Sequence, residues 1–277
     1  MSLDQVTAFT RPATIAEAHQ QVLAGAVPVS GGTDVMLRRH LLAAPVVDLT
    51  ALPLAGISVE GGTVVVGATT TLTDMLDHEA VRAIGGGVLS GMLRHVGSPL
   101  LRNVATIGGH VARGRLSDII PVLLALDASI AFFDGDDHIE TLEQFYGEAR
   151  HRQPIIVTGI SIPVLSPGSA AAFRKFSRTG FDLAILNAAC RIDLAGGEVE
   201  DARIVIGETP ALGARVTPAE RVLAGGPLDE TAIDQASATA ADAVPAGDDD
   251  RASATYRRAL AAVLVRRCLH DVWRDLQ

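Results

Sequence analysis

The sequence predicts an α+β protein built in two successive parts. Short apolar runs separated by turn residues fill much of residues 26–163 and indicate strands. After residue 170, a block of strands is followed by a block of helices, which is the order expected of an α+β domain. Residues 165–170, with the sequence LSPGSA, are rich in proline, glycine and serine and mark the predicted boundary between the parts.

The first part is expected to begin with a helix over residues 12–25. Thr14 and Glu17 have the spacing of a capping box, and Gly25 follows the last turn as a stop. Gly61 and Gly62 are expected to join two strands as a hairpin. The other predicted elements are strands at 26–29, 45–49, 56–60, 63–68, 129–134 and 154–163, a helix capped by Thr71 and Asp74, a helix at 86–97, and a helix at 119–128 capped by Ser117 or Asp118.

The second part is expected to hold three strands followed by three helices. The strands lie within residues 171–208, and Gly196 and Gly197 turn the last pair. The helices are predicted at 217–225, at 229–244 and from about Ala252 onward. In the last helix, one continuous apolar stripe is formed by Val265, Leu269, Val272 and Leu276.

Composition and charge exclude several functions. The net charge of −9 offers nucleic acid or an anionic membrane no general attraction, and no apolar run reaches the length of a membrane span. Cys190 and Cys268 are the only cysteines and have no CxxC spacing, so we expect neither an iron–sulfur cluster nor a disulfide framework in this chain. No signal-peptide pattern is present, and a reduced, cytoplasmic setting is expected.

Two glycine pairs are the main candidates for a binding function. The first lies in Ser30-Gly31-Gly32-Thr33-Asp34, where a strand enters a turn that can aim backbone N–H groups at phosphate oxygens. Thr33 could donate a further hydroxyl, and Asp34 could hold the loop closed by accepting backbone N–H groups. The loop is neither a P-loop nor a dinucleotide fingerprint, and an ordinary tight turn is the alternative interpretation.

The second pair lies in Thr106-Ile107-Gly108-Gly109-His110. It can likewise aim backbone N–H groups at phosphate oxygens. A diphosphate has two phosphoryl groups and can be held from two sides, so two such loops in one domain suggest a shared anionic ligand. The histidines form no metal-ligand pattern, and no nucleophile with a matching base is found. We therefore assign no metal site and no catalytic residue.

These residues carry a resemblance to a known family. The segments RPATIAEAHQQVLAGAVPVSGGTD, GSPLLRNVATIGGHVA, SDIIPVLLALDA, FRKFSRTGFDLAILNAA and YRRALAAVLVRRCL follow one another in family order. The chain resembles the FAD-binding medium subunit of molybdenum hydroxylases, such as carbon monoxide and xanthine dehydrogenases, from about residue 5 to about residue 270. The resemblance implies a two-subdomain FAD-binding domain of the vanillyl-alcohol-oxidase (PCMH) type at 1–166, divided near residue 55. A carbon monoxide dehydrogenase flavoprotein C-terminal domain follows at 167–277.

The resemblance also implies the cofactor-binding residues. In the family the two glycine loops bind the FAD diphosphate, an aspartate after the second loop lies near the flavin or its ribityl chain, and a later segment supplies a basic residue near the flavin ring. Carried over position by position, the predicted FAD-binding residues are Val29, Ser30, Gly31, Gly32, Thr33, Asp34, Thr106, Gly108, Gly109, His110, Ser117, Asp118, Val157 and Lys175.

Three features depart from the family pattern. Ser30 stands where alanine is usual, and His110 stands where asparagine is usual. Arg113 and Arg115 occupy positions where small or acidic residues are common. We expect them to be exposed and either to contact a partner subunit or to alter access to the flavin face.

The family function is electron transfer within a complex. The resemblance implies a small subunit with two [2Fe–2S] clusters and a large subunit with the molybdenum cofactor, assembled as a dimer of heterotrimers. The present chain would pass electrons through FAD to an external acceptor. Two alternatives remain open at this stage, a flavin-free assembly subunit and a free-standing FAD oxidase.

Overall fold

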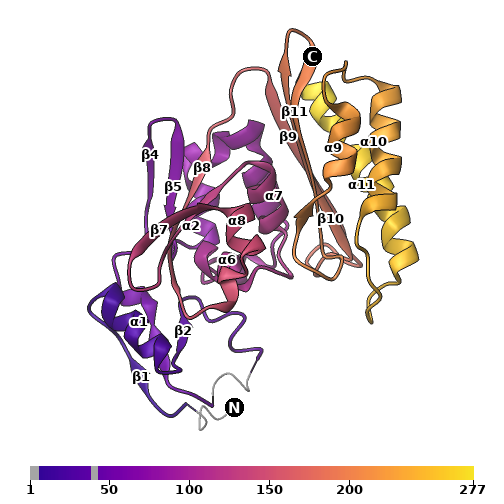
Figure 1. The fold of residues 1–277 in the computed structure, drawn as a ribbon. Helices are drawn as coiled ribbons and strands as arrows, with labels where there is room; N and C mark the ends of the chain where they lie inside the picture. Colours follow the sequence, from indigo (N-terminus) through magenta and orange to yellow (C-terminus); the bar gives the residue numbers. More distant parts are fainter. Residues whose placement is uncertain (1–5, 39–42) are drawn as a thin grey trace. The chain divides into compact units, whose positions relative to one another are not determined.

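The computed structural model describes residues 6–38 and 43–277, and the chain divides into two compact units. The first unit contains Met1–His78, Ser98–Arg113 and Ala128–Ile162, and the second contains Glu79–Gly97, Gly114–Asp127 and Pro163–Gln277. Figure 1 labels many of their elements. The second unit therefore includes two segments that precede the predicted boundary at 165–170 in the sequence.

The first unit contains two sheets. The smaller sheet has the strand order β1-β3-β2 with parallel pairing, and the larger has the order β4-β5-β8-β6-β7. The strands are β1 (Phe9–Thr10), β2 (Val27–Val29), β3 (Val46–Asp48), β4 (Ile57–Glu60), β5 (Thr63–Gly67), β6 (Ser129–Phe133), β7 (Asp137–Thr141) and β8 (Ile156–Pro163). The helices are α1 (Ile15–Leu23), α2 (Leu72–Asp77), α5 (Pro99–Arg102), α6 (Ile107–Arg113) and α8 (Leu142–Gly147), with short 3-10 turns η2 (Leu49–Ala51) and η4 (Arg150–Arg152).

Local sequence signals explain most of these elements. The Thr14 hydroxyl accepts a hydrogen bond from the N–H of Glu17 at the start of α1, and Gly25 follows its end with a positive φ of 92°. The Thr71 hydroxyl caps α2 in the same way. The β4–β5 hairpin turns at Gly61 and Gly62, and β5 alternates buried and half-buried residues because one face covers the core.

The strand β7 and the helix α8 were absent from the sequence prediction. In β7 the apolar residue Ile139 points to solvent while the polar His138 and Glu140 are half-buried, so the usual alternation is inverted. A capping box of Thr141 and Gln144 starts α8 and was present in the sequence as an unused signal.

The second unit has one antiparallel sheet covered by helices. The strand order is β12-β11-β10-β9, and Gly196 and Gly197 turn β10 into β11 as predicted. The strands are β9 (Ser169–Phe176), β10 (Leu186–Ala195), β11 (Glu198–Gly207) and β12 (Ala214–Arg215). The helices are α3 (Glu79–Ala83), η3 (Ile84–Gly87), α4 (Val88–Leu93), α7 (Ile119–Ala125), α9 (Thr217–Leu223), α10 (Glu230–Ala243) and α11 (Ala254–Asp275).

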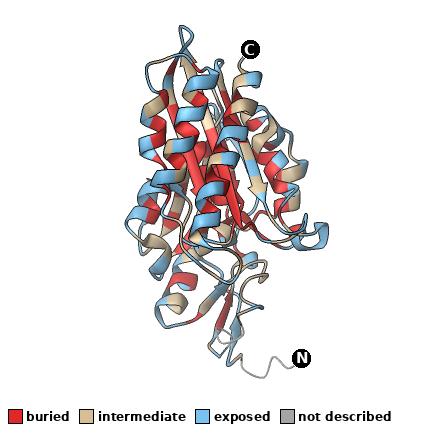
Figure 2. Ribbon diagram, turned by 90° about the vertical axis from the view of Figure 1, so that its right-hand side faces the viewer, coloured by how far each residue is buried: buried red, intermediate tan, exposed pale blue. Residues whose placement is uncertain are grey.

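The main core of this unit lies between the sheet and helices α9 to α11 (Figures 1 and 2). The predicted stripe on α11 is confirmed, since Val265, Leu269 and Val272 are fully buried and Leu276 packs at the edge. The predicted count of three strands is short by one, because the two-residue β12 pairs with β11. None of the helices in the described residues is long and apolar enough to cross a membrane.

Candidate functional site

The first glycine loop, residues 30–34, directly follows β2. A side chain at Gly31 would overlap the backbone carbonyl of Val104, and Gly32 has a positive φ of 67°. Over the described residues, the backbone N–H groups of Gly31, Gly32 and Thr33 have no hydrogen-bond acceptor, and the buried Ser30 hydroxyl has no partner. Unpartnered donors of this kind are costly unless a ligand accepts from them. The loop thus offers one hydroxyl and three backbone donors.

The second glycine segment, residues 106–110, has a different structure from the loop that the sequence predicted. Residues from Ile107 onward form α6, and the N–H groups of Ile107 and Gly108 donate to the carbonyls of Thr70 and Ala68 at 3.1 and 2.9 Å. The N–H of Gly109 donates to the Thr106 hydroxyl at 3.3 Å. The prediction of a second set of free backbone donors is therefore wrong, because the helix and the neighbouring strand end use them.

The second segment contributes shape and one hydroxyl instead. A side chain at Gly108 would lie 2.7 Å from both the carbonyl oxygen and the Cβ of Ala68, whereas at Gly109 the nearest atom is the Thr106 hydroxyl at 3.2 Å. Gly108 is thus required for close backbone packing, and Gly109 leaves an open face. The Thr106 hydroxyl already accepts a hydrogen bond, and its own hydrogen finds no acceptor in the part of the chain that the structure describes.

The first glycine pair packs against the residues that precede the second pair, within the first unit. The side-chain position of Gly31 points at the carbonyl of Val104 and lies 3.1 Å from the Cα of Ala105, immediately before Thr106. The first loop thus contacts the residues just before the second segment, and the joint binding of one ligand by the two loops stays a prediction. Val157 is buried in the same unit, on β8, where its partner across the ladder is Phe132.

Charged side chains surround the first glycine loop. Asp34 forms ion pairs with Arg38 and with Arg113, the last residue of α6. Over the described residues the partners found for the Asp34 carboxylate are these two guanidinium groups, in place of the backbone N–H groups that the sequence suggested. The expectation that Arg113 is an exposed docking residue is wrong, since its side chain is only 25% exposed and is paired; Arg115 is exposed as predicted.

His110 is neutral at physiological pH in this setting. Burial and, to a smaller extent, the nearby Arg113 lower the pKa of its imidazole to about 4, against the opposing effect of Asp34. A neutral imidazole can accept one hydrogen bond and donate another, as the amide of an asparagine does.

The other predicted charged residues lie in the second unit. The Lys175 ammonium, on β9, donates to the Asp118 carboxylate at 2.7 Å and to the carbonyl of His95 at 3.2 Å. The Asn187 amide on β10 donates to the other oxygen of Asp118 at 2.8 Å. Both members of the Asp118–Lys175 ion pair are more than nine-tenths buried. Ser117, expected as a helix cap, accepts a hydrogen bond from the N–H of Ile119 at 3.3 Å.

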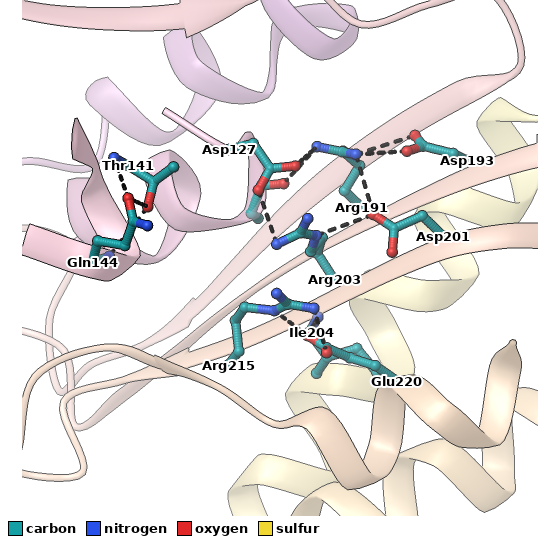
Figure 3. Close-up of polar contacts among 11 residues, drawn as sticks. Asp127, Thr141, Gln144, Arg191, Asp193, Asp201, Arg203, Ile204, Arg215 and Glu220 are labelled. Carbon is teal, nitrogen blue, oxygen red and sulfur yellow. Dashed lines mark hydrogen bonds and ion pairs between the residues drawn. The ribbon is translucent and has the colours of Figure 1, made fainter. Parts of the chain in front are cut away.

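The helix α7, which begins after Asp118, is fixed at its other end by an ion-pair network (Figure 3). Arg191 and Arg203 are direct cross-strand neighbours on β10 and β11, an unfavourable position for two like charges. The Asp127 carboxylate accepts from each at 2.8 Å, and Asp193 and Asp201 complete the network. The network therefore attaches the end of α7 to the sheet.

Sequence reasoning missed Asn187 and Glu208, which hold the Ser117–Asp118 turn. The N–H of Ser117 donates to Glu208 at 2.9 Å, and Glu208 is only 4% exposed. Burial raises the pKa of the Glu208 carboxyl, with a smaller contribution of the same sign from Asp118. No local pattern marks either residue, because each acts on a segment about 70 to 90 positions away.

Comparison with known proteins identifies matching families over most of the chain. Residues 4–165 match the model of the FAD binding domain in molybdopterin dehydrogenase, and residues 171–272 match the CO dehydrogenase flavoprotein C-terminal domain. The carbon monoxide dehydrogenase medium chain of Afipia carboxidovorans is 29% identical over 94% of each chain. The glyceraldehyde dehydrogenase medium chain of Sulfolobus acidocaldarius is 26% identical over 88% of this chain and 90% of its own.

A solved structure shares the fold along nearly the whole chain. It is carbon monoxide dehydrogenase from Hydrogenophaga pseudoflava in a form that lacks the Mo-pyranopterin moiety of the molybdenum cofactor. The TM-score is 0.89 and the identity 25%, with 96% of this chain and 97% of that chain covered.

Proposed function

Since the chain belongs to the family of FAD-binding domains of molybdopterin dehydrogenases, we propose that it passes electrons from iron–sulfur clusters of a partner subunit through FAD to an external acceptor. Its cofactor is FAD, and it is an oxidoreductase subunit of the medium-chain type. Bound FAD would supply the redox chemistry of the subunit.

The first glycine loop carries this proposal. The three backbone N–H groups of Gly31, Gly32 and Thr33 and the buried Ser30 hydroxyl have no acceptor over the described residues, and a diphosphate supplies several acceptor oxygens. The donor set fits this anion, because backbone N–H groups can approach phosphate oxygens where no side chain intervenes. The same unpartnered donors argue against a flavin-free assembly subunit.

We assign the predicted residues two kinds of task. In the first unit the glycine loop donates hydrogen bonds, Gly109 leaves space, Thr106 and His110 can donate further hydrogen bonds, and Val29 and Val157 supply apolar contact. In the second unit Ser117, Asp118 and Lys175 provide a rigid, charged group for the flavin part of the cofactor. The Lys175 ammonium and the Asp118 carboxylate form a buried ion pair, so the two charges balance each other.

The iron–sulfur clusters are assigned to a partner subunit. A [2Fe–2S] cluster takes four ligands, most often cysteines, whereas this chain has two, both fully buried in the second unit. The relatives are medium chains of multisubunit enzymes, which favours a complex with a small and a large subunit over a free-standing oxidase. Arg115 is the remaining arginine candidate for the docking surface.

The substrate belongs to the partner subunits in this proposal. Medium chains of a carbon monoxide dehydrogenase and of a glyceraldehyde dehydrogenase match this chain at similar identity, so the fold is compatible with different substrates of the complex.

Purification of the chain with and without co-expressed partner subunits tests the proposal. We expect about one FAD per chain, released into solution by acid because it is bound non-covalently, and substrate-dependent reduction of a dye only in the complex. A single chain that hydroxylates an organic substrate at a useful rate would contradict the subunit role. A purified chain that cannot bind added FAD would contradict the cofactor assignment.

A further inference from the structure

A buried glutamate holds the backbone of the Ser117–Asp118 turn. The N–H of Ser117 donates to Glu208 Oε1 at 2.9 Å, and the residues Ser117, Asp118 and Glu208 are each more than nine-tenths buried. Glu208 adopts a positive φ of 62°, which is uncommon for a residue with a side chain. The Glu208 carboxylate thus reaches the turn from a residue with this uncommon backbone conformation.

Glu208 is the first member of a series of ion pairs in which carboxylates and arginines alternate. Arg251 contacts Glu208 Oε2 at 3.4 Å and Asp249 at 3.3 Å, and Asp249 in turn accepts from Arg257 at 2.7 Å. Arg257 is completely buried and also donates to the carbonyls of Ile185, Gly247 and Ala252. Arg251 thus contacts the Glu208 oxygen that Ser117 does not use, and Arg257 holds Asp249, the other partner of Arg251.

The side chain of Asp118 is held independently by Lys175 and Asn187. The turn therefore has two attachments, one through the N–H of Ser117 and one through the carboxylate of Asp118. Burial of a carboxylate is costly, and two carboxylates close to each other add to that cost. An apolar residue at position 208 would avoid the cost but could not accept from Ser117.

We propose that Glu208 is a positioning residue of the flavin site, which fixes the Ser117–Asp118 turn in the conformation that binds FAD. The inference rests on the proposed function, because it takes Ser117 and Asp118 as cofactor-binding residues. Glu208 acts through Ser117 and does not itself contact the cofactor in this assignment. In this proposal Arg251 and Arg257 support cofactor binding indirectly, because they hold Glu208 and Asp249 in place.

Glu220 provides a matched control in the same unit. It is 5% exposed, accepts from the N–H of Ile204 at 3.0 Å and forms an ion pair with Arg215 at 2.7 Å (Figure 3). Glu208 and Glu220 thus have equal burial and the same kinds of partners, one backbone N–H and one arginine. Only Glu208 contacts residues 114–118 among the contacts described for the two.

The test compares Glu208→Met and Glu208→Gln with Glu220→Met and Glu220→Gln in the full chain. The measurements are the Kd for FAD added to the flavin-free protein, the visible spectrum of the bound flavin, and amide hydrogen exchange over residues 114–118. We expect Glu208→Met to raise the Kd at least about tenfold, to shift the spectrum and to speed exchange of the Ser117 amide, since one buried acceptor is lost. Glutamine retains an acceptor oxygen, so Glu208→Gln should restore the Kd to within about threefold of wild type.

Both Glu220 variants should lower thermal stability while leaving the Kd within about twofold of wild type. Equal changes in Kd for the Glu208 and Glu220 variants, or an unchanged Kd for Glu208→Met, would overturn the positioning role while FAD binding by the wild type stands. If the wild type itself fails to bind FAD, the proposed function fails as well. Should Glu208→Met not fold, Arg251→Gln decides the question, because it removes the cation that orients Glu208; an unchanged Kd with that variant overturns the proposal.

Discussion

The two glycine pairs look alike in the sequence and differ in the structure. In both pairs the first glycine, Gly31 or Gly108, packs directly against a backbone carbonyl. A Cβ at the second glycine would meet only side-chain atoms, in ordinary contact at Gly32 and at 3.2 Å from the Thr106 hydroxyl at Gly109. The pairs differ in their hydrogen bonds. The N–H groups of the first pair have no acceptor within the described chain, whereas those of the second are bonded to Ala68 and Thr106.

Within each pair, one glycine is therefore needed for folding and the other for ligand binding. The first glycine of each pair allows two backbone segments to touch, and the second leaves the space that a ligand can occupy. Only residues 31–33 then supply backbone donors, while the second segment provides shape and the Thr106 hydroxyl. The variants below test this division, starting with the largest expected effect.

Alanine at Gly31 or Gly108 should destabilise the protein without any ligand present. The added Cβ would overlap Val104 in one case and lie 2.7 Å from Ala68 in the other, and overpacking against backbone cannot be relieved by a rotamer change. We expect a loss of about 3 kcal/mol or more in the free energy of unfolding, with Gly31→Ala the more severe. Urea denaturation of the flavin-free chain measures it.

Gly91→Ala is the control for these variants. Gly91 lies within α4, and a Cβ there meets no atom within 4 Å, so alanine should stabilise the helix by up to about 1 kcal/mol. Equal urea midpoints for Gly31→Ala and wild type would show that the close backbone packing is not required.

Valine at Gly109 or Gly32 should abolish FAD binding and leave most of the fold intact. A side chain at Gly109 meets only the Thr106 hydroxyl at 3.2 Å, so it would mainly occupy the space assigned to the diphosphate. At Gly32 the positive φ adds a backbone cost of about 1–2 kcal/mol. We expect FAD affinity to fall at least about 100-fold, or about 2.7 kcal/mol, as measured by flavin titration. Flavin content near that of wild type in both variants would show that neither glycine pair takes part in FAD binding.

Ser30→Ala should affect folding and binding in opposite directions. The buried hydroxyl has no partner in the flavin-free chain, so its removal should leave stability unchanged or slightly raised. In the complex it removes one donor to the cofactor and should weaken FAD binding about five- to tenfold, or about 1 kcal/mol. Unchanged FAD affinity would exclude the hydroxyl from the site. Thermal melting with and without FAD distinguishes the two effects.

The lowered pKa of His110 predicts that the free energy of unfolding depends slightly on pH. Burial and Arg113 lower its folded pKa to about 4 from an ordinary value of 6.5, so the unfolded chain binds the proton more readily. The contribution of His110 is therefore lost as pH falls below about 6.5, by about 0.7 kcal/mol between pH 7 and pH 6, an upper limit for a partly exposed ring. Comparison of the urea midpoints of wild type and His110→Asn checks it. Parallel pH profiles for the two proteins would contradict the shift.

Local signals in the sequence predicted the elements that local interactions determine. Thr14 and Thr71 cap helices, Gly61-Gly62 and Gly196-Gly197 turn hairpins, and the α11 stripe is buried, as their spacing indicated. The β7 strand escaped prediction because its polar residues, not Ile139, face inward. The helix α6 escaped because a Gly-Gly pair disfavours a helix, and contacts to Ala68 and Thr70 override that preference.

The site was predictable only in part for the same physical reason. Family motifs pointed to both glycine pairs and to Asp118, but partners of Asp34 and Asp118 come from residues distant in sequence. Arg113 lies 79 positions from Asp34, and Lys175 lies 57 positions from Asp118. Side-chain pairing over such separations depends on the folded topology, which no local pattern encodes.

The most direct test of the central claim is a titration of the flavin-free chain with FAD and with riboflavin, using wild type and Gly109→Val. If the glycine pairs hold the diphosphate, wild type should bind FAD at least about 100-fold more tightly than riboflavin, which has no phosphate. Gly109→Val should then remove most of that preference while leaving riboflavin affinity unchanged. Equal affinities of wild type for the two flavins, or an equal loss of both in Gly109→Val, would contradict the account.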